Sequence, residues 1–481
     1  MTASAGTRTR PAVAAIRPRA RRRESGLLII VALVLLLGSV SLGATQRELA
    51  GQKVTWLPAD AGQLVVYLTA LFGAHLALVL AGRRSDQVLL PTIGLLAGIS
   101  LLLMERLPQS LVTQSLAGRT FGLASIQLGW LLLALAVITI VALAVRSDAW
   151  LRRYKYTWAA AGISLLLLTF LFGNEVNGAL LTIQIGPLSG QPTELIKVIL
   201  VIFLAGYLSE FRPLLVEASM RLGPLQLPPL PYLLPMLAMW AMALGIVVIQ
   251  RDLGAALLFF AVFLALVYIA TARASYVVVG LILFAAGSVV AYQLFGTVRD
   301  RVDIWINPFA DASGKGYQVV QSLYAFARGG IIGTGLGAGL PLVGGRLPIP
   351  AIHTDFPFAA LGEELGLIGV VAILGLYLIV IERGLRVAAS AADDFRSLLA
   401  AGLTLVVGVQ AFIIAAGNLK LIPLTGVTLP FISYGGSSLL ANGVVIGLLL
   451  ALSDRGVEPP PPAPAGRRRF AFLRGSRQEA G

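Results

Sequence analysis

The sequence predicts an all-α, polytopic integral membrane protein with about twelve transmembrane helices, and three observations support this prediction. Of its 481 residues, 57% are hydrophobic and only 12% are charged, whereas soluble domains have about 25% charged residues. The apolar residues form continuous runs such as Leu27 to Val40, unlike the alternating pattern of an outer-membrane barrel. Lysine and arginine gather in alternate loops, as they do in helical membrane proteins.

Twelve apolar runs are each about as long as a membrane span, which takes about 20 residues. They lie at about 27–43, 61–82, 88–104, 123–145, 156–173, 193–211, 230–250, 253–271, 275–296, 356–382, 397–416 and 433–452. The loops on the predicted cytoplasmic side carry basic groups such as Arg83-Arg84 and Arg152-Arg153, whereas the opposite loop 174–192 has no lysine or arginine. This charge pattern predicts an even number of spans with both termini in the cytoplasm.

The net charge of +14 comes largely from the two tails. A basic tail can bind nucleic acid, but next to membrane spans it more simply anchors the chain beside anionic lipid, so we expect no nucleic-acid partner. We divide the chain into a flexible basic tail 1–25, a five-helix region 26–173, a core 174–455 and a flexible Pro/Arg-rich tail 456–481. Within the core, residues 297–355 form one long extracytoplasmic loop with an expected helical stretch around Tyr317–Ala327. Ordered loops of this length are usually functional.

The composition also excludes several kinds of site. With no cysteine, the chain has no disulfide, thiolate metal site or cysteine nucleophile. Its only histidines are His75 and His353, too few for a histidine-rich metal centre or haem.

Acidic and basic residues inside or beside membrane helices are costly, so they are the first candidates for function. Glu194 and Lys197 lie three residues apart on one face of a predicted helix, which fits either an ion pair at the helix end or a ligand-binding pair. Asp252 follows Arg251 at a very tight turn, where it would cap the next helix.

The strongest candidate is Asp355 in the segment His353-Thr354-Asp355-Phe356-Pro357. It lies where the long outer loop enters a helix, so it could be the N-cap of that helix or a general base for a substrate presented from the bilayer. A helix N-terminus would lower the pKa of the carboxyl, whereas burial would raise it. Glu363 and Glu364 follow one to two turns later, and we expect them to bond to neighbouring helices or loop backbone.

Two glycine-containing segments could either bind phosphate groups or have a purely structural role. Residues 333–337, with the sequence GTGLG, do not open a dinucleotide-binding unit. Residues 423–438, with the sequence PLTGVTLPFISYGGSS, form an irregular stretch before the last helix. Its N–H groups could bind a diphosphate, or the segment could be a turn packed inside the protein.

Taken in order, several motifs resemble those of the RodA/FtsW/SpoVE (SEDS) family of bacterial shape, elongation, division and sporulation proteins. They are QPTELIK with Glu194, QRDLG with Asp252, GYQVVQS at 316–322 with Gln318 and Gln321, GTGLG, HTDF, GEELG and the 423–438 segment. The resemblance covers about residues 177–452. It implies a peptidoglycan glycosyltransferase that polymerises lipid II at the outer face of the bacterial cytoplasmic membrane, together with a class B penicillin-binding protein.

The resemblance also implies residue roles. The essential acid of the family falls on Asp355, the proposed base. The Glu194/Lys197 pair and the segment of Ser433, Tyr434, Gly435, Gly436, Ser437 and Ser438 match family positions that line or shape the cavity. We add as further candidates for substrate binding or the cavity Asp252, Gln318, Gln321, His353, Thr354, Glu363 and Glu364. Arg301, Lys420, the GTGLG backbone and possible divalent cations (Mg or Mn) are the candidate partners of the diphosphate; the metal ligands are unknown, and no cofactor is firmly implied.

The chain departs from the family in three places. Members usually have about ten spans, so two extra helices are expected near the N-terminus. Leu181-Thr182 replaces a common Arg-Trp pair, and QRDLG replaces QPDLG. Two other functions therefore stay open: a lipid II flippase, and a non-catalytic scaffold that recruits a transpeptidase.

Overall fold

The computed structural model describes residues 20–53, 61–116, 119–176, 179–185, 188–217, 220–222, 225–227, 245, 252–339 and 347–454. Its helices are α1 (Arg22–Leu49), α2 (Ala61–Leu80), α3 (Leu89–Arg106), α4 (Leu123–Ala144), α5 (Ala149–Arg153), α6 (Lys155–Phe172), α7 (Pro192–Glu217), α9 (Leu253–Thr271), α10 (Ala274–Leu294), α11 (Gly296–Ile306), α12 (Tyr317–Gly329), α13 (Pro357–Ala389), α14 (Asp394–Asn418) and α15 (Gly436–Leu452). Two short 3₁₀ helices cover Gln109–Leu111 and Pro308–Asp311. The predicted helical class is confirmed.

Eleven of the twelve predicted spans coincide with these helices. The remaining one, 230–250, lies outside the described residues apart from Gly245, and so do the tails 1–19 and 455–481. Within the described part of the chain, ten helices are long and apolar enough to cross a membrane, and α15 is an apolar helix of 17 residues. The total of twelve spans therefore stays a prediction.

Short strands, which the sequence pattern did not predict, join several helices. They form the antiparallel pair β1 (Gln114–Leu116) and β2 (Arg119–Phe121), the antiparallel sheet β3 (Asn174–Val176), β4 (Ala179–Ile185) and β5 (Leu188–Gly190), and the pair β6 (Met220–Leu222) and β7 (Leu225–Leu227). In β3–β4, Thr182 pairs with Asn174. The strands are too short to change the all-helical class.

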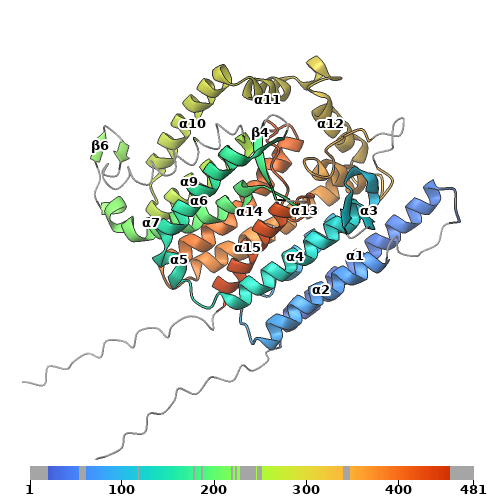
Figure 1. Ribbon diagram of the computed structural model, residues 1–481, viewed down its shortest axis with the longest axis horizontal. Coiled ribbons are helices and arrows are strands. Elements are labelled where there is room, and N and C mark those ends of the chain that lie inside the picture. The colour runs from blue at the N-terminus through green and yellow to red at the C-terminus, as the bar shows by residue number, and fades with distance from the viewer. Residues whose placement is uncertain are drawn as a thin grey trace, which may run out of the picture.

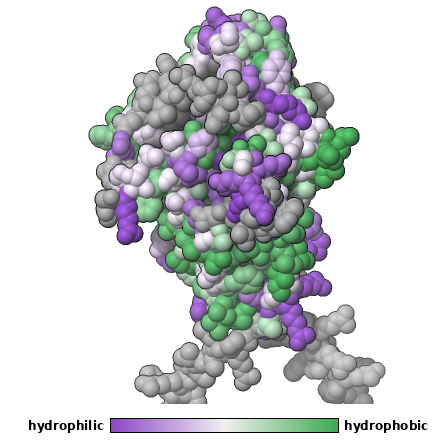
Figure 2. Space-filling view, turned by 90° about the vertical axis from the view of Figure 1, so that its right-hand side faces the viewer, coloured by the Kyte–Doolittle hydropathy of each residue, from purple (hydrophilic) through white to green (hydrophobic). Residues whose placement is uncertain are grey.

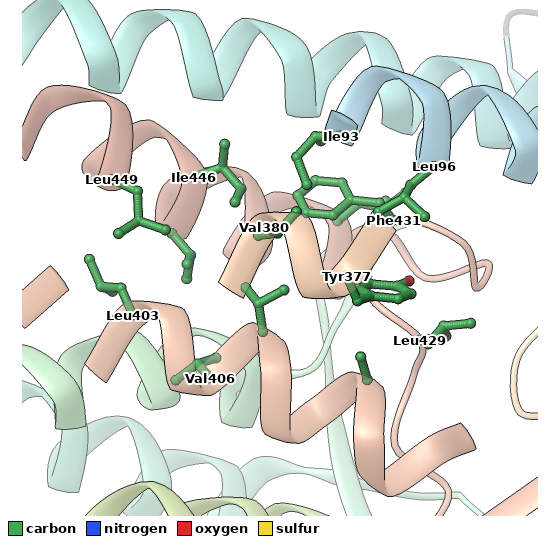
Figure 3. Close-up of a cluster of buried hydrophobic side chains, with 14 of the residues drawn as sticks. Ile93, Leu96, Tyr377, Val380, Leu403, Val406, Leu429, Phe431, Ile446 and Leu449 are labelled. Carbon is green, nitrogen blue, oxygen red and sulfur yellow. The ribbon is translucent and has the colours of Figure 1, made fainter. Parts of the chain in front are cut away.

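Part of the hydrophobic core lies where α3, α13, α14 and α15 meet (Figure 3). Tyr377 of α13 is buried there, and its hydroxyl donates a hydrogen bond to the carbonyl of Pro430 at 2.6 Å. This bond satisfies a polar group that would otherwise be costly to bury. Phe431, buried beside it, adopts a left-handed backbone conformation (φ 63°). The irregular segment before α15 is therefore packed inside the bundle.

The outward-facing sides of α1, α2 and α10 are apolar. Ile30 is 56% exposed, Leu37 71% and Leu283 66%. Figure 2 shows such side chains as a hydrophobic band below a more polar region. Soluble proteins rarely expose large continuous apolar patches, whereas such a band suits contact with lipid. The protein is therefore a multi-pass membrane protein.

The two ends of the described chain lie at the same end of the bundle. Arg83 pairs with Asp454 just after α15, at 3.0 Å, and Arg21 at the start of α1 donates hydrogen bonds to the carbonyls of Arg83 and Ser85. Figure 1 places α11 and α12 at the opposite, upper end. The site described below lies at that upper end, where α15 begins.

Candidate active site

Four helices, α7, α9, α13 and α15, begin close together at the upper end of the bundle. The Ser437 hydroxyl at the start of α15 accepts a hydrogen bond from the Gln191 N–H, which precedes α7, at 3.0 Å. Glu194 in α7 and Asp252 before α9 are close enough to interact electrostatically, and Arg301 interacts with both Asp252 and Asp355. Helix N-termini carry partial positive charge, so this end is suited to an anionic ligand.

Asp355 lies two residues before the start of α13 and does not cap it. The N-cap residue is Phe356, and no side chain makes a capping hydrogen bond there. The backbone of Asp355 is held instead by its own N–H, which donates to the Ala351 carbonyl at 2.9 Å, and by its carbonyl, which accepts from the Asn418 side chain at 3.0 Å. The N-cap alternative is wrong, and the carboxyl group is not used to hold the helix end.

Burial controls the acidity of Asp355. It raises the pKa of this carboxyl from an ordinary 3.8 to about 6, against the opposing effects of a hydrogen bond from Thr354 and the charge of Arg301. A general base works best when its pKa is near the pH at which the enzyme operates. The carboxyl is therefore mostly ionised at neutral pH and more basic than an exposed aspartate.

Arg301, in α11, lies close to two acids, Asp252 and Asp355. Burial lowers the pKa of its guanidinium, and the charges of Asp252 and Asp355 oppose that effect. One guanidinium nitrogen donates to the carbonyl of Thr425 at 3.1 Å. The residue thus brings a positive charge close to Asp355, and its role as a partner of a diphosphate stays a prediction.

The segment that carries Arg301 is tied to the end of α14. The Trp305 indole donates to the Lys420 carbonyl at 3.1 Å, and the Ser322 hydroxyl in α12 donates to the Asn418 carbonyl at 3.0 Å. Asn418 also holds the backbone of Asp355. The long loop is therefore an ordered cover over this end of the bundle where the structure describes it. Its predicted helical stretch is confirmed as α12.

Asp252 has the structural role predicted for it. Its carboxylate accepts a hydrogen bond from the Ala255 N–H at 3.0 Å and caps α9. Burial raises the pKa of this carboxyl, while the Ala255 N–H lowers it, the Glu194 charge raises it and the Arg301 charge lowers it. The preceding Arg251 lies outside the described residues.

Glu194 and Lys197 form a buried ion pair at 2.6 Å. Lys197 also donates to the side-chain oxygens of Gln410 in α14, at 2.8 Å, and Asn442 in α15, at 3.1 Å. An ammonium group has three hydrogens, and here each has an acceptor. Of the two interpretations offered by the sequence, the geometry favours the ion pair.

These contacts belong to a closed ring of buried side chains. Gln410 donates to Thr428, Thr428 bonds to Ser438 at 2.6 Å, and Asn442 donates to Ser438 at 3.2 Å. Since Lys197 binds both Gln410 and Asn442, the ring joins α7, α14 and α15 to the segment before α15. We call these five residues, Lys197, Gln410, Thr428, Ser438 and Asn442, the polar ring.

Glu363 and Glu364 hold the glycine-rich segment, as expected. Glu363 pairs with Arg328 of α12 at 2.9 Å, and Glu364 pairs with Arg106 of α3. Their carbonyls accept hydrogen bonds from the N–H groups of Thr334 and Gly335, at 2.9 and 3.0 Å. The predicted use of these two N–H groups to bind a diphosphate is therefore wrong.

This packing depends on two glycines. Gly366 interrupts the dihedral angles of α13 with a φ of 64°. A Cβ atom at Gly366 would lie 2.3 Å from the backbone nitrogen of Gly333, and one at Gly333 would lie 2.2 Å from the Glu364 carbonyl oxygen. Only glycine permits both this conformation and this approach.

The segment before α15 uses much of its own backbone internally. The Ser433 hydroxyl accepts from the Leu429 N–H at 2.8 Å, and the Tyr434 N–H donates to the His353 carbonyl at 2.8 Å, with the two rings 5.7 Å apart. Gly435 is the N-cap residue of α15, without a side-chain cap. Next to it, a Cβ at Gly436 would clash with Trp130 at 2.4 Å. The packed-turn interpretation is confirmed, and it places His353 against Tyr434.

Three predicted residues contribute less. In the part of the chain that the structure describes, no ion pair or hydrogen bond is recorded for the side chains of Lys420, Gln318 or Gln321. Lys420 enters the site through its carbonyl and a left-handed backbone (φ 59°). The two glutamines are partly buried in α12.

Sequence reasoning missed Gln410, Asn442 and Thr428, because it considered mainly ionisable residues. Gln410 and Asn442 interrupt apolar helical runs and are fully buried. Polar amides inside membrane helices commonly bond across helices, so this was a usable signal.

Comparisons with known proteins identify the family of the chain. The model of the FtsW/RodA/SpoVE family, described as "Cell cycle protein", matches residues 86–456, which leaves α1 and α2 before it. The chain is 42% identical over 457 residues to "Peptidoglycan glycosyltransferase RodA" of Mycobacterium tuberculosis, covering 94% of this chain and 95% of the relative. It is 35% identical over 321 residues to "Probable peptidoglycan glycosyltransferase FtsW" of Geobacter metallireducens, covering 66% and 81%.

Two solved structures are also similar. A chain from "Structural coordination of polymerization and crosslinking by a peptidoglycan synthase complex" has a TM-score of 0.60 and 28% identity, covering 77% of this chain and 98% of its own length. The rod shape determining protein RodA of Thermus thermophilus has a TM-score of 0.53 and 25% identity, covering 77% and 97%.

Proposed function

Because the chain belongs to the FtsW/RodA/SpoVE family of cell cycle proteins, we propose that it is a peptidoglycan glycosyltransferase, the activity named for its relatives. Its substrate is lipid II, which it polymerises into glycan strands at the outer face of the bacterial cytoplasmic membrane. The observation that carries this proposal is the partly buried Asp355 with a raised pKa beside Arg301.

In this reaction a sugar 4-hydroxyl attacks the anomeric carbon of a lipid-linked strand, and a lipid diphosphate leaves. Asp355 takes the hydroxyl proton as the new carbon–oxygen bond forms, and the electron pair of the broken bond leaves with the diphosphate. A pKa of about 6 keeps the carboxyl ionised at neutral pH and basic enough to accept that proton. Attack from the face opposite the diphosphate inverts the configuration at the anomeric carbon.

Arg301 is the candidate electrostatic partner of the diphosphate. Its guanidinium is held by the Thr425 carbonyl and lies near both Asp252 and Asp355, so its position is fixed before the substrate binds. Preorganised positive charge stabilises a developing negative charge strongly in a site that excludes water. The N-terminus of α15, at the same end of the bundle, adds partial positive charge to this region.

A divalent cation has little support from the protein side chains alone. Among the described residues, no group of three or more His, Asp or Glu side chains lies close enough to hold a metal ion. A cation at the diphosphate would need the oxygens of the diphosphate itself as ligands. The chemistry proposed above uses only the groups of the chain.

The orientation and the partner belong to the same proposal. With the termini in the cytoplasm, as the basic tails favour, Asp355 faces the outside, where lipid II is polymerised. The partner is a class B penicillin-binding protein with transpeptidase activity, which would cross-link the new strands. Support for it comes from the similarity to a chain of a peptidoglycan synthase complex.

One assay separates the possible functions. The purified full-length chain, together with a class B penicillin-binding protein from the same genome, is placed in liposomes with fluorescent lipid II. Formation of glycan polymer is the expected result. Movement of lipid II across the bilayer without polymer would identify a flippase and contradict the proposal. If neither polymer nor movement is seen, the proposal is also contradicted, and the chain acts as a scaffold.

A further inference from the structure

A second polar site lies at the end of the bundle opposite Asp355. It is a pocket of about 400 Å³ lined by Asp148, Ala149, Arg152, Arg153, Lys155, Asp393 and Phe395. These residues come from the short helix α5, the residues on either side of it and the beginning of α14. Figure 1 places α5 at the lower end of the bundle, away from α11 and α12. The pocket has no part in the chemistry proposed at Asp355.

The two acidic residues of the pocket already interact with other groups of the protein. Asp393 caps α14 by accepting a hydrogen bond from the Arg396 N–H at 3.0 Å, and Asp148 lies 3.8 Å from the Arg396 guanidinium. Of the basic residues, Lys155 pairs with Glu210. Within the described parts of the chain, no carboxylate partner is recorded for Arg152 or Arg153. The pocket therefore has two guanidinium groups available to bind an anion.

Aromatic residues place this pocket at the level of the lipid headgroups. Trp150, Tyr154 and Tyr156 are 44%, 51% and 54% exposed, and the guanidinium of Arg153 lies 5.8 Å from the centre of the Tyr154 ring. Tryptophan and tyrosine with this exposure are typical of the membrane–water interface. An anion that reaches the pocket from the side would be part of a lipid.

We propose that this pocket binds the phosphate headgroup of an anionic phospholipid through Arg152 and Arg153. Guanidinium groups are well suited to phosphate because they donate two parallel hydrogen bonds. Basic pockets between membrane helices are a known setting for such headgroups. Bound lipid would join α5 to the start of α14 at the end of the bundle opposite the active site.

The test measures lipid binding rather than polymerisation, so its result is independent of the proposed function. The full-length protein in neutral detergent is titrated with phosphatidylglycerol, phosphatidylcholine or inorganic phosphate, and bound lipid is counted by native mass spectrometry. We expect saturable binding of phosphatidylglycerol alone. In the double variant Arg152→Gln/Arg153→Gln, we expect binding to be about 30-fold weaker. This is the change expected when a protein loses two basic residues that contact anionic lipid.

The matched control removes the same charge outside the pocket. Arg84→Gln/Arg386→Gln alters two exposed arginines near the same end of the bundle, outside both the pocket and the basic tails, and should bind lipid like the wild type. The variant Arg152→Lys/Arg153→Lys, which keeps the charge, should lose less affinity than the glutamine pair. Equal loss in the control pair, or displacement of the lipid by inorganic phosphate at equal concentration, would overturn the proposal.

Discussion

Arg301 lies close enough to Asp355 for its positive charge to act on the acidity of that carboxyl, although the two residues belong to separate elements. Burial of Asp355 raises its pKa, and Arg301 limits the rise. The same guanidinium also faces Asp252, the cap of α9. The charge of Arg301 thus acts both on Asp355, the candidate base, and on Asp252 at the start of α9.

The carboxylate of Asp355 is the first target for mutation. Asp355→Asn keeps the shape of the side chain but removes the base, so polymerisation of lipid II should fall by roughly 10²-fold or more. The measurement is the initial rate with a class B penicillin-binding protein present. A rate near that of the wild type would show that the carboxylate is not the base.

Two variants control this experiment. Asp303→Asn removes the same charge from an exposed position in α11 and should leave the rate unchanged. Glu194→Gln should cost less than Asp355→Asn, because Glu194 is paired with Lys197 in the wall of the site.

The pH dependence follows from the pKa of about 6 for Asp355. Protonation inactivates a base, so the rate should be half-maximal near pH 6 and fall about tenfold per pH unit below that. Arg301→Gln removes a charge that lowers this pKa, so the acid limb should move to higher pH, and the rate at its optimum should fall by about 10²-fold.

Arg299→Gln is the matched control for Arg301→Gln. It lies in the same helix, is exposed, and stacks on Tyr292 at 5.6 Å. Initial rates from pH 5 to 8 should give the same acid limb for Arg299→Gln and the wild type. If the acid limb does not move in Arg301→Gln, the charge of Arg301 does not act on the pKa of Asp355.

The same pKa predicts an effect on stability with an unusual sign. The folded pKa of Asp355, about 6, is above its ordinary value of 3.8, so between these values the folded protein binds more protons than the unfolded chain. The contribution of Asp355 to stability should therefore decrease as the pH rises from about 4 to 6. Asp355→Asn, which cannot ionise, should be at least as stable as the wild type at pH 7.

Thermal unfolding in detergent from pH 4 to 7 checks this prediction. The difference in unfolding temperature between Asp355→Asn and the wild type should shift in favour of the variant as the pH rises. A variant that is clearly less stable at pH 7 would indicate a structural role for the carboxylate.

The polar ring should be important for stability. Lys197→Met leaves Glu194 without its cation and leaves Gln410 and Asn442 without a donor. Breaking a buried pair in this way typically costs about 3–5 kcal/mol. Lys315→Met removes a lysine that is 64% exposed and paired with Asp300, and exposed pairs contribute at most about 1 kcal/mol. Chemical unfolding of the two variants should show this contrast; equal losses would contradict it.

The topology can be tested in a chain that has no native cysteine. Ser147, before α5, and Ser313, before α12, are both exposed and lie at opposite ends of the bundle. A cysteine at Ser147 should react with an impermeant reagent only from the cytoplasm, and one at Ser313 only from outside. Reaction of both from the same side would contradict the predicted orientation.

The sequence by itself determined the helical class and the positions of the eleven predicted spans that the structure describes. In lipid, each span must satisfy its backbone hydrogen bonds internally, and its lipid-facing side chains must be apolar. Both requirements act over about 20 consecutive residues, and they can be read locally. The helix that begins at Tyr317 and the helix cap at Asp252 could also be predicted, because each depends on a few neighbouring residues.

Only the tertiary structure decided the surroundings of Asp355 at the start of α13, where Phe356 is the N-cap residue and burial raises the pKa of the carboxyl. It also brought Arg301 to Asp252 and Asp355, and closed the polar ring around Lys197. These relationships join residues far apart in the chain, and they depend on how helices pack. Burial and distance across helices are properties of that packing, which no stretch of the sequence contains.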